Sequence, residues 1–226
     1  MGKVLRVPYK MLSTPIPLEP FDFKKAALVL MDFQRFTCSR NDGLGLLASQ
    51  RGILPELDEY YAQVDAASEN AIPLLEICRS TGVKVVFTYL HTAKSKNQIS
   101  RQFQVSHLPI PTGKLEDEFH QKLLPAPGEQ ILTRGTYSPF IGTKLQETLQ
   151  EDGKDTLILA GTLFNYTVVT AAREAADLGY NVIVVWNASA SETLDWHLAM
   201  RTGVVGGLIL SRSAEEVIEM IEGKRT

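Results

Sequence analysis

The sequence predicts a three-layer α/β fold, in which a mostly parallel sheet of about six strands is flanked by helices on both faces in a Rossmann-like arrangement. Short apolar runs such as Ala26–Met31 recur along the 226-residue chain, and runs of this kind are typical of strands buried on both faces. Segments with apolar residues at every third or fourth position separate these runs, as in amphipathic helices. Strands that alternate with helices indicate parallel pairing through helical crossovers.

The first half of the chain contains two such strands and one long helix. Its helix ends at Gly82 and places Val64, Ala67, Ala71 and Leu74 on one face. Proline residues mark the beginning of the chain as an extended arm, and polar, proline-containing residues mark a long excursion after the second strand. In order, we expect an arm at 1–24, a strand at 26–31, a loop at 38–55, a helix at 56–80, a strand at 83–89, and an excursion at 92–128 with a short helix near 115–123.

The second half of the chain is more regular, and each strand is followed by a helix. Gly179 is placed to end one of these helices, because glycine adopts the left-handed conformation common at helix C-termini. We expect strands at 130–133, 156–160, 181–186 and 208–210, and helices at 139–151, 167–178, 193–202 and 214–222.

Composition favours a single globular domain, 1–226, without repeats or linkers. Its charged residues, 22% of the chain, leave a net charge of −3, which gives no electrostatic footprint for nucleic acid. Two cysteines are too few for a disulfide scaffold and fit a reducing compartment. No apolar stretch approaches the roughly 18 residues of a membrane helix. We therefore expect a cytoplasmic protein with no membrane or nucleic-acid partner.

Several common motifs are missing from the sequence. It contains no G-x-G-x-x-G after a strand, no G-x-x-x-x-G-K-[ST] and no G-x-S-x-G. Its four histidines are far apart and show no paired metal-binding spacing. A dinucleotide site, a P-loop and an ordinary α/β-hydrolase site are therefore not supported, and we expect neither a metal nor a cofactor.

Polar residues at strand ends mark the expected site, because ligands of open α/β sheets bind beyond the carboxyl ends of the strands. Asp32 and Gln34 follow the first strand, His91 follows the second, and Arg134 follows the third. The stretch 161–167 follows the next strand and opens a helix, whose N-terminus favours an oxyanion. A carboxylate, a guanidinium and a helix N-terminus should therefore meet at one edge.

These residues carry a resemblance to a known superfamily. The strand end Met31-Asp32-Phe33-Gln34, the turn at 133–140 and the stretch at 161–173 resemble the isochorismatase-like (cysteine hydrolase) superfamily over residues 24–212. Gly179-Tyr180 followed by a strand, and His197, are similar as well. Between 55 and 140 the layout is closest to amidohydrolases of ureido, biuret-like or carbamoyl compounds. The resemblance implies a small-molecule substrate and a homo-oligomer, a dimer or tetramer.

In that family an Asp, a Lys and a Cys hydrolyse amides, with the Cys as nucleophile. The resemblance puts the Asp at Asp32, but Arg134 stands in place of the Lys and Thr167 in place of the Cys. It also implies a cis peptide between Thr162 and Leu163, with the N–H groups of Leu163 and Thr167 forming an oxyanion hole. The degenerate triad therefore comprises Asp32, Arg134 and Thr167.

These departures argue against a thiol mechanism. A threonine hydroxyl does not ionise as a thiol does, and an arginine stays protonated. Arg134 should form a fixed ion pair that keeps Asp32 charged. Two interpretations stay open. The chain is a hydrolase in which Asp32 acts as acid or base on a vinyl ether or a C–N bond, or it is an inactive homologue that binds a small molecule or a protein.

The remaining candidates have a structural interpretation beside the functional one. The substrate-binding candidates are Gln34, Phe36, His91, Tyr137, Thr162, Leu163 and Phe164, although aromatic residues at such places are equally often core. Cys38 is a bystander in a loop over the site, or a substitute nucleophile. Cys78 belongs to the core. His197, Trp186 and Trp196 are expected to be packing residues.

Overall fold

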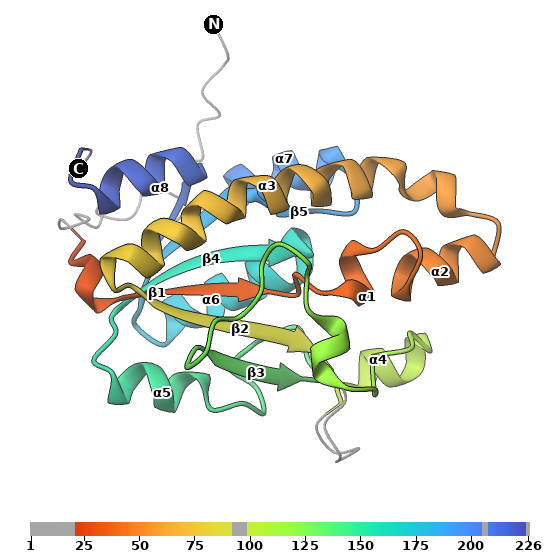
Figure 1. The fold of residues 1–226 in the computed structure, drawn as a ribbon, viewed down its shortest axis with the longest axis horizontal. Coiled ribbons are helices and arrows are strands. Elements are labelled where there is room, and N and C mark those ends of the chain that lie inside the picture. The colour runs from red at the N-terminus through yellow and green to blue at the C-terminus, as the bar shows by residue number, and fades with distance from the viewer. Residues whose placement is uncertain (1–20, 92–98, 205–207, 225–226) are drawn as a thin grey trace, which may run out of the picture.

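The computed structural model describes residues 21–91, 99–204 and 208–224. Most of the expected arm at 1–24 and residues 92–98 of the excursion lie outside these ranges. Six parallel strands form one sheet in the order β3-β2-β1-β4-β5-β6, shown in Figure 1. The strands are β1 Ala26–Met31, β2 Lys84–Leu90, β3 Gln130–Arg134, β4 Thr156–Thr162, β5 Asn181–Ala190 and β6 Ile209–Arg212. The expected α/β fold with a parallel six-stranded sheet is confirmed.

Two helical layers cover the two faces of the sheet (Figure 1). Helices α3 (Asp58–Thr81) and α8 (Ala214–Ile221) pack on one face, and α5 (Leu145–Glu151) and α6 (Val169–Asp177) pack on the other. β1 is buried on both sides because alternate side chains enter the two cores: Leu28 and Leu30 face α3, while Val29 and Met31 face the opposite layer. The apolar run of β1 is therefore explained by its central place. Helix α7 (Leu194–Gly203) packs beside β5.

The structure corrects several expected boundaries. The expected loop at 38–55 contains helix α2 (Gly43–Gln50) and a 3-10 turn (Leu54–Leu57), and α1 (Arg35–Cys38) precedes it. The expected helix at 139–151 is shorter in the structure and comprises only α5, which begins at Leu145. The Ser138 and Thr143 hydroxyls bind backbone groups in the turn before it. The excursion holds α4 (Arg101–Ser106) and a 3-10 turn at Leu115–Glu118. Before α6, a π-helical turn spans Phe164–Val168.

The strand order reverses between β1 and β4, which is where open α/β sheets bind ligands. These two strands approach very closely at their carboxyl ends. A side chain at Gly161, whose φ is 152°, would meet the Met31 carbonyl oxygen at 2.0 Å. Only glycine fits there, and it brings Thr162 next to the end of β1.

Candidate active site

Asp32 directly follows β1 and is the centre of a buried polar constellation. Its backbone adopts a φ of 56°, a left-handed conformation that aspartate tolerates better than most residues. Its side chain is 1% exposed. Carboxylate Oδ1 accepts a hydrogen bond from the Leu90 N–H at 3.0 Å, and Oδ2 accepts from both Arg134 and Thr167. The end of β2 therefore holds Oδ1, and the end of β3 together with the turn after β4 holds Oδ2.

Arg134 is the last residue of β3 and forms a buried ion pair with Asp32. Its Nη2 lies 2.6 Å from Asp32 Oδ2, and the exposed side-chain fractions of the two residues are 0% and 1%. Nη1 donates to the Thr136 carbonyl at 2.6 Å. The expected pairing of these two residues, which are 102 positions apart, is present.

Thr167 lies in the π-helical turn after β4 and completes the constellation. Its Oγ1 donates to Asp32 Oδ2 at 3.1 Å. The peptide between Thr162 and Leu163 is cis, as the sequence resemblance implied. The expectation that the Thr167 N–H would serve an oxyanion hole is wrong, because this N–H donates to the Leu163 carbonyl at 2.8 Å. The π-helical turn uses the group for its own backbone.

Burial raises the pKa of the Asp32 carboxyl above its ordinary value of 3.8. The Arg134 guanidinium lowers this pKa, and so do the hydrogen bonds from Thr167 and Leu90, but the loss of water outweighs them. The sequence suggested the opposite balance, with Arg134 keeping Asp32 charged. The raised pKa matters for chemistry, because it brings the Asp32 carboxyl closer to the neutral pH range in which an acid or base exchanges protons.

Further hydrogen bonds fix the Asp32 backbone and the side chain of Gln34, two residues after it. The Asp32 carbonyl accepts from the hydroxyls of Thr37 and Thr162, the latter at 2.7 Å. Gln34 is fully buried and spans the ends of two strands: its Oε1 accepts from the Leu90 N–H, and its Nε2 donates to the Leu90 carbonyl and to Glu118. Gln34 is therefore a structural clamp with its polar atoms occupied.

The other predicted substrate-binding residues occupy different surroundings. Phe36 is buried, and its N–H donates to Glu118 at 3.1 Å. His91 interacts through its ring Nε2 with the Gly113 carbonyl at 3.1 Å. Tyr137 packs against two rings, Phe103 edge-on at 4.8 Å and Tyr166 stacked at 5.0 Å, measured between centroids.

Phe164 is a core residue. It is completely buried against the α6 side of the sheet, and its ring meets His197 edge-on. His197 is also buried and lies against Trp186, so these two residues pack as expected. Trp196 is 51% exposed, and its expected packing role is wrong for the described part of the chain. The reason is its place on the outer side of α7.

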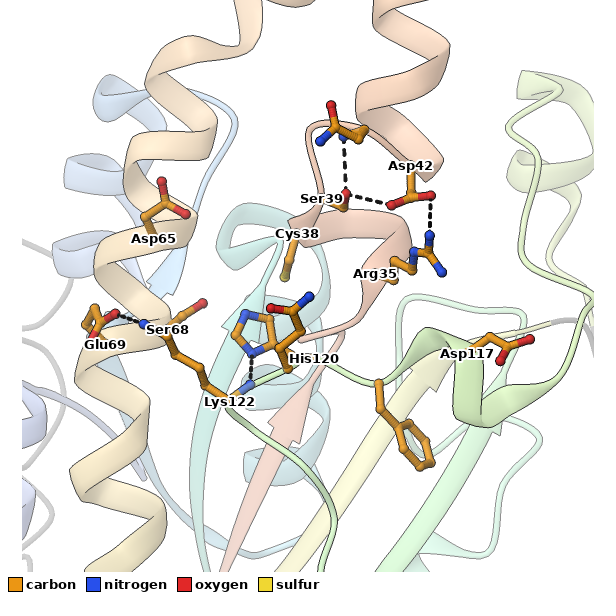
Figure 2. A pocket seen from close by; sticks show the side chains of 13 residues that line it. Arg35, Cys38, Ser39, Asp42, Asp65, Ser68, Glu69, Asp117, His120 and Lys122 are labelled. Atoms are coloured by element: carbon orange, nitrogen blue, oxygen red, sulfur yellow. Dashed lines mark hydrogen bonds and ion pairs between the residues drawn. The ribbon is translucent and has the colours of Figure 1, made fainter.

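The larger cavity at this edge has a volume of about 820 Å³ and lies between α1, α3 and the segment 117–122. Figure 2 shows polar side chains around it, with the Cys38 thiol pointing into it toward the segment that carries His120. Two ion pairs line its walls, Arg35 with Asp42 at 2.8 Å and Lys122 with Glu69. Neither Asp32, Arg134 nor Thr167 lines this cavity.

The Cys38 thiol is close to the constellation but poorly suited to attack. Its Sγ lies 4.0 Å from the Asp32 carbonyl oxygen and 3.6 Å from Thr37 Oγ1. Burial raises its pKa to about 12, so the thiol is protonated at neutral pH. This favours the bystander interpretation over the substitute nucleophile. Cys78 is fully buried in the core, as expected.

A smaller cavity of about 180 Å³ lies beside Leu163, the residue after the cis peptide. Its walls come from α2, the 3-10 turn after it, and Tyr60 of α3. Tyr60 also connects it to the constellation, because its hydroxyl donates to the Thr37 carbonyl at 3.0 Å. Leu163 is therefore the one predicted site residue that contributes to either cavity.

Sequence reasoning missed three groups that hold the constellation: the Leu90 N–H, Thr37 and Glu118. Leu90 and Glu118 lie far from Asp32 in the chain, so no local pattern reveals their contact. Thr37 lies five residues after Asp32, and a hydroxyl so close to a strand end is a usable signal for a backbone hydrogen bond.

Two kinds of feature are absent from the part of the chain that the structure describes. Within 21–91, 99–204 and 208–224, no group of three or more His, Cys, Asp or Glu side chains is arranged to hold a metal ion. Over the same part of the chain, none of the helices has the length and apolar character needed to cross a membrane.

The chain resembles known proteins along most of its length. Residues 26–212 match the family model of the isochorismatase domain. The secreted isochorismatase effector Isc1 of Verticillium dahliae is 25% identical over 185 residues, which cover 78% of this chain and 92% of that protein. Maleamate amidohydrolase of Pseudomonas putida is 28% identical over 171 residues, or 74% and 80% of the two chains.

A solved structure has the same fold. The cysteine hydrolase from Pseudomonas syringae pv. phaseolicola superposes with a TM-score of 0.77 at 19% identity, and the match covers 94% of this chain and 99% of that one. The fold and the family-model match agree with each other. The chain belongs to the isochorismatase family.

Proposed function

We propose that the protein is a small-molecule hydrolase that acts without a cysteine nucleophile. The observation that carries the proposal is the Asp32 carboxyl, which is buried, has a raised pKa and is hydrogen-bonded to Arg134 and Thr167. A carboxyl whose pKa is shifted by burial and by a specific charge partner at the ligand-binding edge of an α/β sheet is a candidate acid or base. Two relatives are named for isochorismatase and amidohydrolase activities.

The three residues have different roles in this mechanism. Asp32 gives its proton to the substrate, at the vinyl carbon of a vinyl ether or at the departing nitrogen of a C–N bond. Alternatively, it takes a proton from the water that attacks the substrate. Arg134 cannot shuttle a proton, so it stabilises negative charge on the carboxylate or on the substrate. Thr167 donates a hydrogen bond and does not attack, because its hydroxyl has no accessible ionised form.

Other residues are proposed to contact the substrate. Leu163, Tyr137 and His91 are partly exposed at the carboxyl edge of the sheet. Phe36, Gln34 and Thr162 support the loop after β1, so their effect on a substrate passes through that loop. The buried position of Phe164 removes it from this proposed set.

The alternative is an inactive homologue that binds a ligand, and a specific observation favours it as well. Asp32, Arg134 and Thr167 are 1%, 2% and 1% exposed, and the Asp32 carboxylate binds both of the other side chains. Neither cavity is lined by any of the three. In such a protein the constellation would be a structural ion pair beneath a binding surface.

Turnover by the purified protein separates these functions. The substrates are isochorismate and a panel of ureido, carbamoyl and simple amide compounds. A hydrolase turns over one class, and Asp32→Asn abolishes the turnover. An inactive homologue binds a ligand without turnover in either form. The double variant Thr167→Cys with Arg134→Lys tests whether the pocket is preserved: new amidase activity supports a preserved pocket, and its absence leaves that idea unsupported.

We also propose three properties of the whole chain. It forms one domain, and it assembles as a homo-oligomer through three exposed apolar side chains of α7, namely Leu194, Trp196 and Leu198. It resides in the cytoplasm, where its two free cysteines stay reduced. Sedimentation velocity of wild type and Trp196→Ser tests the assembly, which the variant should weaken.

A further inference from the structure

The smaller cavity has the size and lining of a site for a compact apolar group. Its volume is about 180 Å³, and an aliphatic cavity of about 150 Å³ is large enough to hold benzene. Aliphatic side chains and one aromatic ring make up most of the wall: Leu44, Leu47, Ala48, Ile53, Leu57, Tyr60 and Leu163. A ring-sized body would be buried there on several sides.

Two charged side chains complete the lining. Arg51, at the end of α2, is exposed and makes no ion pair among the described residues. Glu192, beyond β5, accepts a hydrogen bond from Asn165 Nδ2 at 3.2 Å. The cavity therefore offers an unpaired guanidinium, which suits one carboxylate, and a carboxylate that disfavours a second anion.

The position of the cavity agrees with a ligand site. It lies at the carboxyl edge of the sheet beside the β1/β4 reversal, where Leu163 directly follows β4. Thr162, the preceding residue, donates to the Asp32 carbonyl at 2.7 Å. The cavity thus borders the buried constellation but remains open to a ligand without disturbing it.

We propose that this cavity binds a small monocarboxylic acid with a ring-sized apolar body. The apolar body occupies the space between α2, Tyr60 and Leu163, and the carboxylate pairs with Arg51. This site goes beyond the proposed hydrolase function, because binding requires neither turnover nor Asp32.

Benzoate is the probe, and isothermal titration calorimetry on the full chain measures its binding. Arg51→Gln should weaken benzoate binding about tenfold, because a charge-assisted hydrogen bond is lost, while Arg51→Lys keeps most of the affinity. Leu47→Trp should abolish binding, because Leu47 lines the cavity and a larger side chain at this partly buried position would occupy it. Arg101→Gln, which removes an exposed arginine from α4, is the matched control and should change nothing.

Ligand comparisons separate the two contributions. Benzyl alcohol lacks the charge and acetate lacks the apolar body, so each should bind at least tenfold more weakly than benzoate. Terephthalate should also bind more weakly, because its second carboxylate meets Glu192. Circular dichroism checks that Leu47→Trp is folded. If it is not, Leu44→Trp is used as a second variant that fills the cavity.

The proposal is overturned if benzoate does not bind, or if its affinity is unchanged by Arg51→Gln and by the filling variant. Equal binding of benzyl alcohol and benzoate would overturn the role of Arg51. These outcomes are independent of the hydrolase. Benzoate binding with no turnover of any substrate removes only the proposed function, and turnover without benzoate binding removes only this site.

Discussion

Two regions at the same edge of the sheet differ in how their reactive groups are placed. The Asp32–Arg134–Thr167 constellation is almost completely buried, and hydrogen bonds occupy its carboxylate. The cavity beside Cys38 is large and open, but its thiol is protonated and its ion pairs are partly exposed. Reactivity and accessibility are therefore separated in this chain, whereas in a thiol hydrolase the same residue provides both.

The buried and the exposed ion pairs also differ in how much they contribute to the free energy of unfolding. A buried ion pair costs a great deal when one partner is removed, because the remaining charge stays in a low-dielectric interior. An exposed pair loses little, because water and salt already screen it. Substitutions in the two regions should therefore have effects of very different size.

Arg134→Ala should produce the largest effect. It leaves the Asp32 carboxylate buried without its partner and should reduce the free energy of unfolding by about 3–5 kcal/mol. Urea denaturation measures the change. Arg35→Ala in the open cavity is the matched control, and its effect should be far smaller because Arg35 and Asp42 are solvated. Equal effects would show that the constellation is no more critical than the cavity wall.

The pH dependence of stability tests which force dominates at Asp32. Because burial raises its folded pKa above the unfolded value of 3.8, the charged form is disfavoured in the folded protein. The contribution of Asp32 to stability is therefore full at low pH and is lost as the pH rises through the folded pKa. Relative to Asp32→Asn, wild type should lose stability as the pH rises above the unfolded pKa of 3.8 and through the folded pKa. A relative gain with rising pH would mean that Arg134 outweighs burial.

Thr167→Val should have a smaller effect. It keeps the shape of the side chain but removes the 3.1 Å hydrogen bond to Asp32 Oδ2, which retains its bond to Arg134. We expect a loss of about 1 kcal/mol in the free energy of unfolding. Thr167→Ser, which keeps the hydroxyl, is the control. A larger loss in Ser than in Val would assign the role of Thr167 to its methyl group.

The smallest effect is expected at Cys38. Its pKa of about 12 leaves almost no thiolate at neutral pH, so iodoacetamide should modify the folded protein far more slowly than free cysteine. Mass spectrometry of intact protein follows the reaction, and Cys38→Ala identifies the modified site. Rapid modification at Cys38 would reveal a reactive thiol in the open cavity.

The sheet could be predicted from the sequence because its central strands are buried on both faces, which leaves continuous apolar runs such as Ala26–Met31. Helix α2 could not be predicted, because it contains two glycines and has no clear apolar periodicity. The reason for one of them appears only in three dimensions: a side chain at Gly43 would meet the Phe36 carbonyl oxygen at 2.3 Å. The close approach of α1 and α2 requires it.

The candidate site also has features that the sequence predicts and features that only the three-dimensional structure reveals. Asp32, Arg134 and Thr167 were predictable because parallel strands bring their carboxyl ends to one edge. The hydrogen bond of the Thr167 N–H was not predictable, because it depends on a π-helical turn. The raised pKa of Asp32 was not predictable either, because it depends on how deeply the carboxyl is buried. The lining of the larger cavity also combines α1, α3 and residues 117–122, which no local pattern connects.

Hydrolysis is proposed to depend on the Asp32 carboxyl and on no thiol. Turnover of the best substrate by Asp32→Asn and by Cys38→Ala, compared with wild type at equal folded fraction, tests it most directly. Loss of an acid or base lowers turnover by about 10²–10⁴-fold, so Asp32→Asn should fall by at least about a hundredfold while Cys38→Ala keeps the wild-type rate. A Cys38→Ala variant without activity, beside an active Asp32→Asn, would contradict the account.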